Sequence, residues 1–146
     1  MTIPRKYTTL LAIVAMASQV ALCAMTVASG EEIPLHWDVR GDADDYGSAN
    51  QVWWLPLLSF LLFLLLGFFV RHPEYCHWPR RFTDERKGLR LLSALVGCLR
   101  LVATLFLTFV VYEVYRDAGF HYRVASLFLV ALVATVAVYA WRLSKA

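Results

Sequence analysis

The stretch Val52–Val70, VWWLPLLSFLLFLLLGFFV, decides the fold class. It carries no charged residue over 19 positions, and Leu and Phe make up most of it. A helix of this length spans about 28 Å at 1.5 Å per residue, which suits a hydrocarbon core about 30 Å thick. Only helices and closed barrels satisfy their backbones in lipid, and the run is too long and too uniformly apolar for a barrel strand. The stretch therefore predicts a membrane-spanning helix.

Three further apolar runs accompany it, at residues 7–29, 91–111 and 124–141. The chain is 60% hydrophobic, against about 45–50% in an ordinary soluble domain. A soluble fold would leave almost no chain for a polar surface. We therefore expect an all-α integral membrane protein, in which residues 1–146 form a single domain and four transmembrane helices make a compact antiparallel bundle.

The charges predict how this bundle is oriented. The segment 71–90 holds six Arg or Lys residues, whereas the segment 30–51 holds one. Arg5 and Lys6 lie near the N-terminus, and Arg142 and Lys145 lie near the C-terminus. Because cationic segments stay in the cytoplasm, both termini and an inner basic loop at 71–90 are predicted inside, with an outer loop at 30–51.

The first run also allows a second interpretation. A basic start, an apolar stretch and the small residues Ala28, Ser29 and Gly30 describe a secretory signal peptide as well. The apolar part is long for such a peptide. We therefore favour a retained first helix, with cleavage as the alternative.

Polar residues inside the predicted helices form a second set of candidates. Ser93, Gly97, Arg100, Thr104 and Thr108 recur at spacings of 4, 3, 4 and 4, which places them on one helix face. A charge within the membrane costs at least about 2.5 kcal/mol on insertion scales, so Arg100 should face the bundle or a water-filled cavity. It either contributes to a ligand or signalling site, or snorkels toward the cytoplasm, or bonds to the threonines and to Gln19 of the first run. Near the outer surface, Glu113 is expected to pair with Arg116.

The predicted outer loop, EEIPLHWDVRGDADDYGSANQ at 31–51, holds six acids against Arg40. We expect Pro34 to redirect the chain as it leaves the lipid, and His36 and Trp37 to hold the loop at the interface while the acids face water. The local role expected of His36 is to bond backbone groups or an aspartate of the loop. The candidate partner-binding residues are Pro34, His36, Trp37, Asp38, Asp45 and Tyr46.

The same loop resembles a known family. Ile33–Asp38, followed by Gly41 and by Asp45–Ser48, is similar to the signature loop of the domain of unknown function 1648, which is also the N-terminal part of immunity proteins against a sporulation-delaying toxin. The stretch HPEYCHWP at 72–79, followed by FTDE at 82–85, resembles stand-alone members, although Cys76-His77-Trp78 stands where they have Phe-Asn-Tyr. The resemblance covers about residues 5–115 and implies a multi-pass protein of the bacterial cytoplasmic (inner) membrane.

Three functions remain open at this point. The first is binding or sensing of a peptide or envelope partner through the acidic outer loop, in an immunity or signalling role. The second is a structural or accessory subunit of a larger membrane assembly or transporter. The third, a metal site or an enzyme, is disfavoured because no phosphate loop, nucleophile elbow or HExxH pattern occurs and the acids do not complete a calcium loop. We expect no catalysis, no cofactor, no metal and no nucleic acid partner; the expected partners are the lipid bilayer and a peptide or membrane protein.

Overall fold

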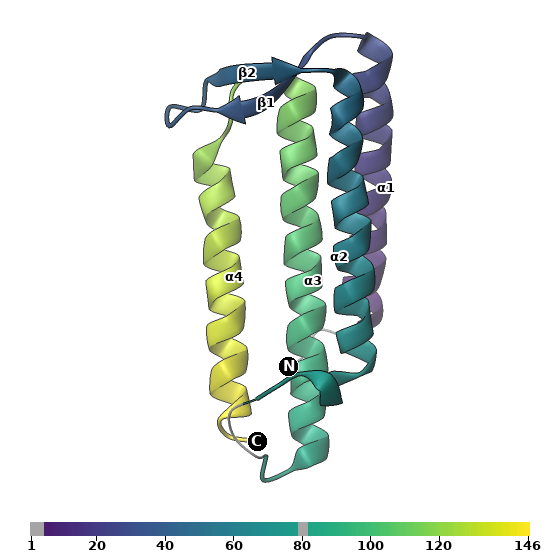
Figure 1. The fold of residues 1–146 in the computed structure, drawn as a ribbon. Helices are drawn as coiled ribbons and strands as arrows, with labels where there is room; N and C mark the ends of the chain where they lie inside the picture. The colour runs from purple at the N-terminus through teal and green to yellow at the C-terminus, as the bar shows by residue number, and fades with distance from the viewer. Residues whose placement is uncertain (1–4, 79–81) are drawn as a thin grey trace.

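The computed structural model describes residues 5–78 and 82–146. These residues form four long helices and a two-stranded hairpin (Figure 1). The elements are α1 (Arg5–Ser29), β1 (Ile33–Trp37), β2 (Ala43–Gly47), α2 (Trp54–Arg71), α3 (Glu85–Arg116) and α4 (Tyr122–Leu143), with short 3₁₀ turns at η1 (Ala49–Trp53) and η2 (Pro73–Tyr75). All four α-helices are long and apolar enough to cross a membrane, as the sequence predicts.

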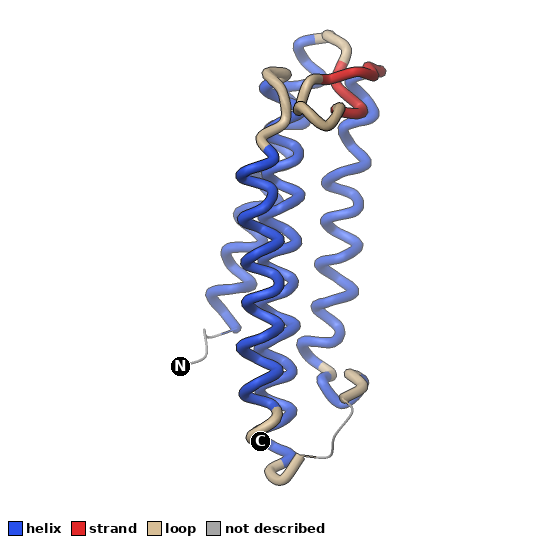
Figure 2. Tube along the Cα trace, turned by 90° about the vertical axis from the view of Figure 1, so that its left-hand side faces the viewer, coloured by secondary structure: helices blue, strands red, loops and turns tan. Residues whose placement is uncertain are grey.

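The helices alternate in direction, so that the two ends of the molecule differ. The hairpin lies at one end, together with the turn between α3 and α4 (Figure 1). The start of α1, the end of α2 and the C-terminus lie toward the other end, which Figure 2 shows from a second side. The acidic segment 30–51 and the basic segment 71–90 are therefore at opposite ends, as expected for an antiparallel arrangement.

The prediction of an all-α chain is wrong in the segment 30–51, where β1 and β2 pair as antiparallel strands. Pro34 lies opposite Tyr46, and His36 lies opposite Asp45, with irregular register on either side of His36. Proline favours an extended residue before it and is tolerated in edge strands, and both strands of a hairpin are edges. The hairpin is invisible to hydropathy because it is short and polar.

The third helix is longer than predicted. It begins at Glu85 rather than at residue 91, so six residues of the predicted inner loop are helical. The Asp84 side chain accepts a hydrogen bond from the backbone N–H of Lys87 at 3.0 Å, which caps the helix. At the far end, Asp117 adopts a left-handed conformation with φ 43° and ends the helix.

The predicted compact bundle holds for α1, α2 and α3, but α4 lies along α3 on the side away from α1 (Figure 1). In α4, two residues are buried, Tyr139 and Leu143, and both lie in its last turns. A groove of about 440 Å³ remains between α3 and the first half of α4. Its lining is almost wholly apolar and includes Phe106, Phe128 and Leu132. The core of the protein therefore lies among the first three helices.

Candidate functional site

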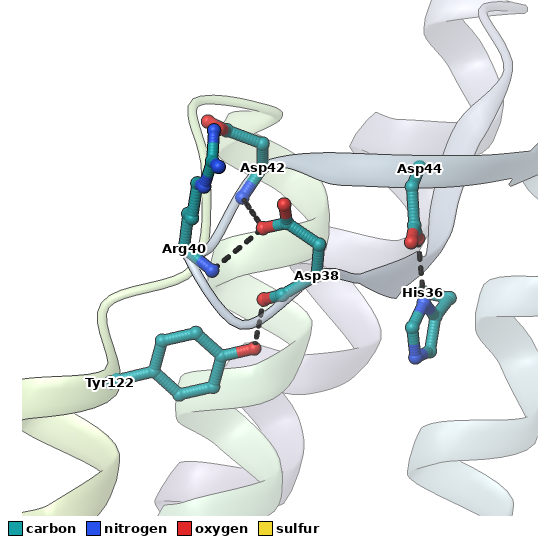
Figure 3. A network of polar contacts seen from close by, with 6 residues as sticks. All are labelled: His36, Asp38, Arg40, Asp42, Asp44 and Tyr122. Atoms are coloured by element: carbon teal, nitrogen blue, oxygen red, sulfur yellow. Dashed lines mark hydrogen bonds and ion pairs between the residues drawn. The ribbon is translucent and has the colours of Figure 1, made fainter.

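The turn of the hairpin is built around Asp38. One carboxylate oxygen of Asp38 accepts hydrogen bonds from the backbone N–H groups of Arg40 and Asp42, at 2.8 and 3.0 Å (Figure 3). The backbone N–H of Asp38 donates to the carbonyl of Asp42, and that of Gly41 donates to the carbonyl of Asp38. Gly41 has φ 92°, which a residue with a side chain rarely adopts. Asp38 therefore fixes the shape of the turn, and its predicted contact with a partner stays a prediction.

The turn is fastened to the segment that joins α3 to α4. Tyr122 donates from its hydroxyl to the backbone carbonyl of Asp38 at 2.6 Å (Figure 3), and the N–H of Phe120 donates to the carbonyl of Gly41 at 2.8 Å. The rings of Trp37 and Phe120 lie 5.0 Å apart. Trp37 is therefore half-buried against Phe120 and helps to anchor the hairpin. Neither Phe120 nor Tyr122 was expected from the residue pattern as a support of the hairpin.

His36 extends from the hairpin into open space. Its Nδ1 lies 2.6 Å from a carboxylate oxygen of Asp44, and the side chains are 68% and 49% exposed (Figure 3). An aspartate of the loop is the partner that the sequence predicted for His36. Asp45 lies opposite His36 in the strand register and is exposed as well. Pro34, which is part of β1, has by contrast a fully buried side chain.

Tyr46 makes a second bridge from the hairpin to the helices. Its hydroxyl lies 3.4 Å from a carboxylate oxygen of Asp117, just beyond the end of α3. Partial desolvation raises the pKa of Tyr46, and the negative charge of Asp117 and the hydrogen bond to it act in the same direction. Tyr46 is nevertheless 46% exposed. The six predicted binding residues therefore divide into three that build or anchor the hairpin (Pro34, Trp37 and Asp38) and three that are exposed on it (His36, Asp45 and Tyr46).

The predicted pairing of Glu113 with Arg116 is wrong. Glu113 is 2% exposed and pairs with His121 instead. The backbone N–H of His121 donates to its carboxylate at 3.1 Å, and Nδ1 of the same histidine lies 2.8 Å away. The guanidinium of Arg116 instead lies over the ring of Tyr112. Glu113 thus holds the first residues of α4 against α3, directly below the anchored hairpin turn.

The segment 30–51, which contains the hairpin, is strongly acidic. Arg40 is its one cation against six acids, four of them within the hairpin. The carboxylate of Asp38 is used by the turn and that of Asp44 by His36, whereas Glu31, Glu32, Asp42 and Asp45 are exposed. Val39 at the tip of the turn is 93% exposed. Among the residues that the structure describes, no group of three or more His, Cys, Asp and Glu side chains is arranged to hold a metal ion.

The predicted intramembrane residues lie at the interface of α1, α2 and α3. Gln19 is fully buried, and its amide N–H groups donate to the Ser59 hydroxyl, the Thr108 hydroxyl and the carbonyl of Thr104, at 2.9–3.2 Å. Thr104 is buried too and donates to the carbonyl of Arg100 within α3. The polar face predicted on the third helix therefore faces α1 and α2. Residues of this face form hydrogen bonds to neighbouring helices, of the kind that join helices in lipid.

Arg100 does not bond to Gln19. Its Nη2 donates to the hydroxyl of Thr9, near the start of α1, and its guanidinium lies 4.5 Å from the ring centre of Phe63. The side chain therefore extends toward the basic end of the bundle but remains buried, at 5% exposed, so it does not reach water as a snorkelling arginine does.

The match with known proteins is confined to the hairpin region. No curated protein and no solved structure is significantly similar to the chain. The family match does not reach the stretch 72–85, whose resemblance remains a prediction. Residues 29–60, which comprise the hairpin, η1 and the start of α2, match the domain of unknown function DUF1648, so the resemblance inferred from the loop is confirmed there.

Proposed function

We propose that this chain is a multi-pass protein of the bacterial cytoplasmic membrane whose hairpin faces outward and binds a cationic peptide, or a cationic segment of an envelope protein. The charge asymmetry of the segments supports the orientation, because the six cations of 71–90 favour the cytoplasmic side. The opposite placement of the hairpin and that segment is consistent with it (Figure 1). The proposal involves no catalysis and no cofactor.

One observation carries the proposal: the hairpin turn is fastened to the helices, while Glu31, Glu32, Asp42 and Asp45 remain exposed. Tyr122, Phe120 and Asp38 fix the turn through bonds of about 0.5–1.5 kcal/mol each. A surface that is ordered before binding loses less conformational entropy than a flexible loop when a partner binds, and this improves affinity. A loop needed only to connect two helices would not require such anchoring.

The chemistry of the exposed surface suggests the kind of partner. Free carboxylates attract a cationic peptide and accelerate its encounter, an effect that salt weakens. Trp53 and Trp54, 40% and 70% exposed, follow the hairpin in the chain and offer aromatic anchors. Each strand of a two-stranded sheet also has one edge without a strand partner, to which an extended peptide can add. No observation favours an immunity role over other roles in peptide binding.

A photo-crosslinking experiment in native membranes tests the proposal. A photoreactive residue replaces Val39 at the hairpin tip, and a second protein carries it at Leu127, which is 66% exposed on α4. We expect a crosslinked partner with a cationic segment from position 39. We also expect it to be lost in the Asp42→Asn, Asp45→Asn variant, whose substitutions leave the bonds of Asp38 intact. A partner that is independent of these carboxylates, or no partner from position 39, would contradict the proposal.

The structure also supports a second candidate, an accessory subunit of a larger membrane assembly. In the apolar window of α4 that could span a membrane, 6% of the residues are buried, against 33% in that of α3. Its small residues Ala131 and Ala134 are exposed, and small residues permit close helix packing in lipid. This candidate predicts protein crosslinks from position 127 rather than from position 39.

A further inference from the structure

Arg100 lacks the partners that a charged group within a helix bundle needs. It is 5% exposed, and its Nε is buried without a hydrogen-bond partner. Within residues 5–78 and 82–146, Nη2 is the one nitrogen of its guanidinium that donates a hydrogen bond, to Thr9. Among the described residues, no carboxylate lies within ion-pair distance of Arg100. A buried charge without a counter-ion is costly, so the site favours an anion from outside the chain.

The other charges around Arg100 are cations as well. Arg5, the first residue of α1, lies one turn from Thr9, which bonds the guanidinium, and Arg71, the last residue of α2, lies one turn from Gly67, which contacts it. Arg5 and Arg71 are exposed, and the guanidinium lies about 6 Å further inside the bundle. Three helices thus bring one arginine each to within about one helical turn of the same level.

A glycine makes room for the guanidinium of Arg100. A Cβ on Gly67, one turn before Arg71, would come within 3.2 Å of Nη1. The ring of Phe63 supports the face of the guanidinium at 4.5 Å. Phe63 and the bond to Thr9 therefore hold the guanidinium in one orientation. Among the described residues, no acceptor binds Nη1 or Nε, so Nη1 can still donate to an oxygen of a phosphate group.

We propose that Arg100, with Arg5 and Arg71, binds a phosphate-type anion between α1, α2 and α3 at the basic end of the bundle. The two sources of this chemistry are the headgroup of an anionic phospholipid and free phosphate. Basic pockets between transmembrane helices at this level are suited to lipid headgroups. The site lies at the opposite end from the hairpin and does not depend on the function proposed for it.

Native mass spectrometry of the purified protein tests the site. The protein is titrated with phosphatidylglycerol, with phosphatidylcholine of the same acyl chains, and separately with inorganic phosphate. We expect phosphatidylglycerol to bind more tightly than phosphatidylcholine, and Arg100→Gln to weaken that binding about fivefold. Arg90→Gln, which removes an exposed cation of α3 outside the cluster, serves as the matched control and should bind like the wild type.

The remaining outcomes are distinct. Competition by millimolar inorganic phosphate would assign the site to soluble phosphate, whereas lipid binding without such competition would assign it to the headgroup. If Arg100→Gln fails to fold, Arg71→Gln tests the same cluster at an exposed position and should also weaken binding. Equal binding of the two lipids, with no effect of phosphate and none of either arginine variant, would overturn the proposal.

Discussion

The first three helices and the fourth are held by different means. Between α1, α2 and α3, hydrogen bonds of Gln19, Ser93 and Arg100 cross the interfaces at several levels. Along α4, polar contacts to Glu113 and the hairpin lie at one end, and Tyr139 and Leu143 are buried at the other. Between them, Phe128 contacts the rings of Phe106 and Phe109 of α3. The groove between α3 and α4 lies in between.

The difference shows how the hairpin is positioned. Lipid tails are as apolar as the helices, so hydrophobic burial does not drive helices together in a membrane, and polar contacts and close packing decide the arrangement. The first three helices form a frame by such contacts. The first residues of α4 are instead tied to Glu113 and, through Tyr122, to the hairpin. The start of α4 and the hairpin should therefore loosen together.

The largest effect is expected for Glu113→Ala. The substitution removes the buried carboxylate that accepts from the backbone and the ring of His121. Hydrogen bonds to charged groups contribute about 1.5–3 kcal/mol, and we expect the free energy of unfolding to fall by about that amount. Hydrogen exchange should rise in residues 38–42 and in the first turns of α4, and not in α1.

Glu113→Gln is the matched control, because its amide oxygen can still accept from the backbone N–H of His121. We expect a smaller loss of stability from it. If Glu113→Ala left exchange in the hairpin unchanged, the coupling of hairpin and α4 would be refuted.

A smaller effect is expected for Gln19→Leu, which tests the frame of three helices. The variant removes donors to Ser59 and Thr108, and interhelical bonds of this kind contribute about 0.6 kcal/mol on average and up to about 1.7. The Oε1 of Gln19 is buried without a partner, and removing it offsets part of the loss. We expect about 1 kcal/mol of destabilisation in bicelles, and none from Ser18→Ala on the exposed face of α1. An unchanged stability in Gln19→Leu would show that packing alone holds α1 in place.

Tyr122→Phe should have a local effect. It removes one hydroxyl that donates to the carbonyl of Asp38 and leaves the ring contact with Phe120 in place. A loss of about 0.5–1.5 kcal/mol is expected, with faster exchange confined to the turn at 38–42. Faster exchange throughout α4 would instead mean that this hydroxyl holds the whole helix.

The smallest expected effect concerns Tyr46. Its pKa is raised, so the neutral hydroxyl that bonds Asp117 is present at neutral pH. The contact should be lost as the pH rises from about 10 through the raised pKa, because the phenolate is repelled by the carboxylate. The difference in ultraviolet titration between the wild type and Tyr46→Phe isolates this group. Asp117→Asn should lower the pKa of Tyr46, and an unchanged value would remove Asp117 as a cause.

Residue patterns predicted the frame well and the site in part. The four apolar runs were sufficient to predict the helices, because a chain in lipid must satisfy its own backbone. The one-sided spacing of Ser93 to Thr108 predicted the buried polar face, because polar residues in lipid face other helices. The strands of the hairpin were missed because they are short and polar, and the fastening of the hairpin was missed because it joins residues far apart in the chain, such as Asp38 with Tyr122. The pairing of Glu113 was predicted wrongly for a related reason: Arg116 is one turn away on the same helix, whereas His121 reaches it across the turn into α4.

The orientation of the hairpin is the central claim, and cysteine labelling in spheroplasts tests it most directly. Val39→Cys marks the hairpin tip, and Glu85→Cys marks the basic end, both with Cys76 replaced by Ser. Cys76 itself is a poor marker, because burial and then Glu74 raise the pKa of its thiol and slow its reaction. We expect a membrane-impermeant maleimide to label position 39 in intact spheroplasts and position 85 only after permeabilisation. Labelling of position 85 alone before permeabilisation would place the hairpin inside and contradict the proposed function.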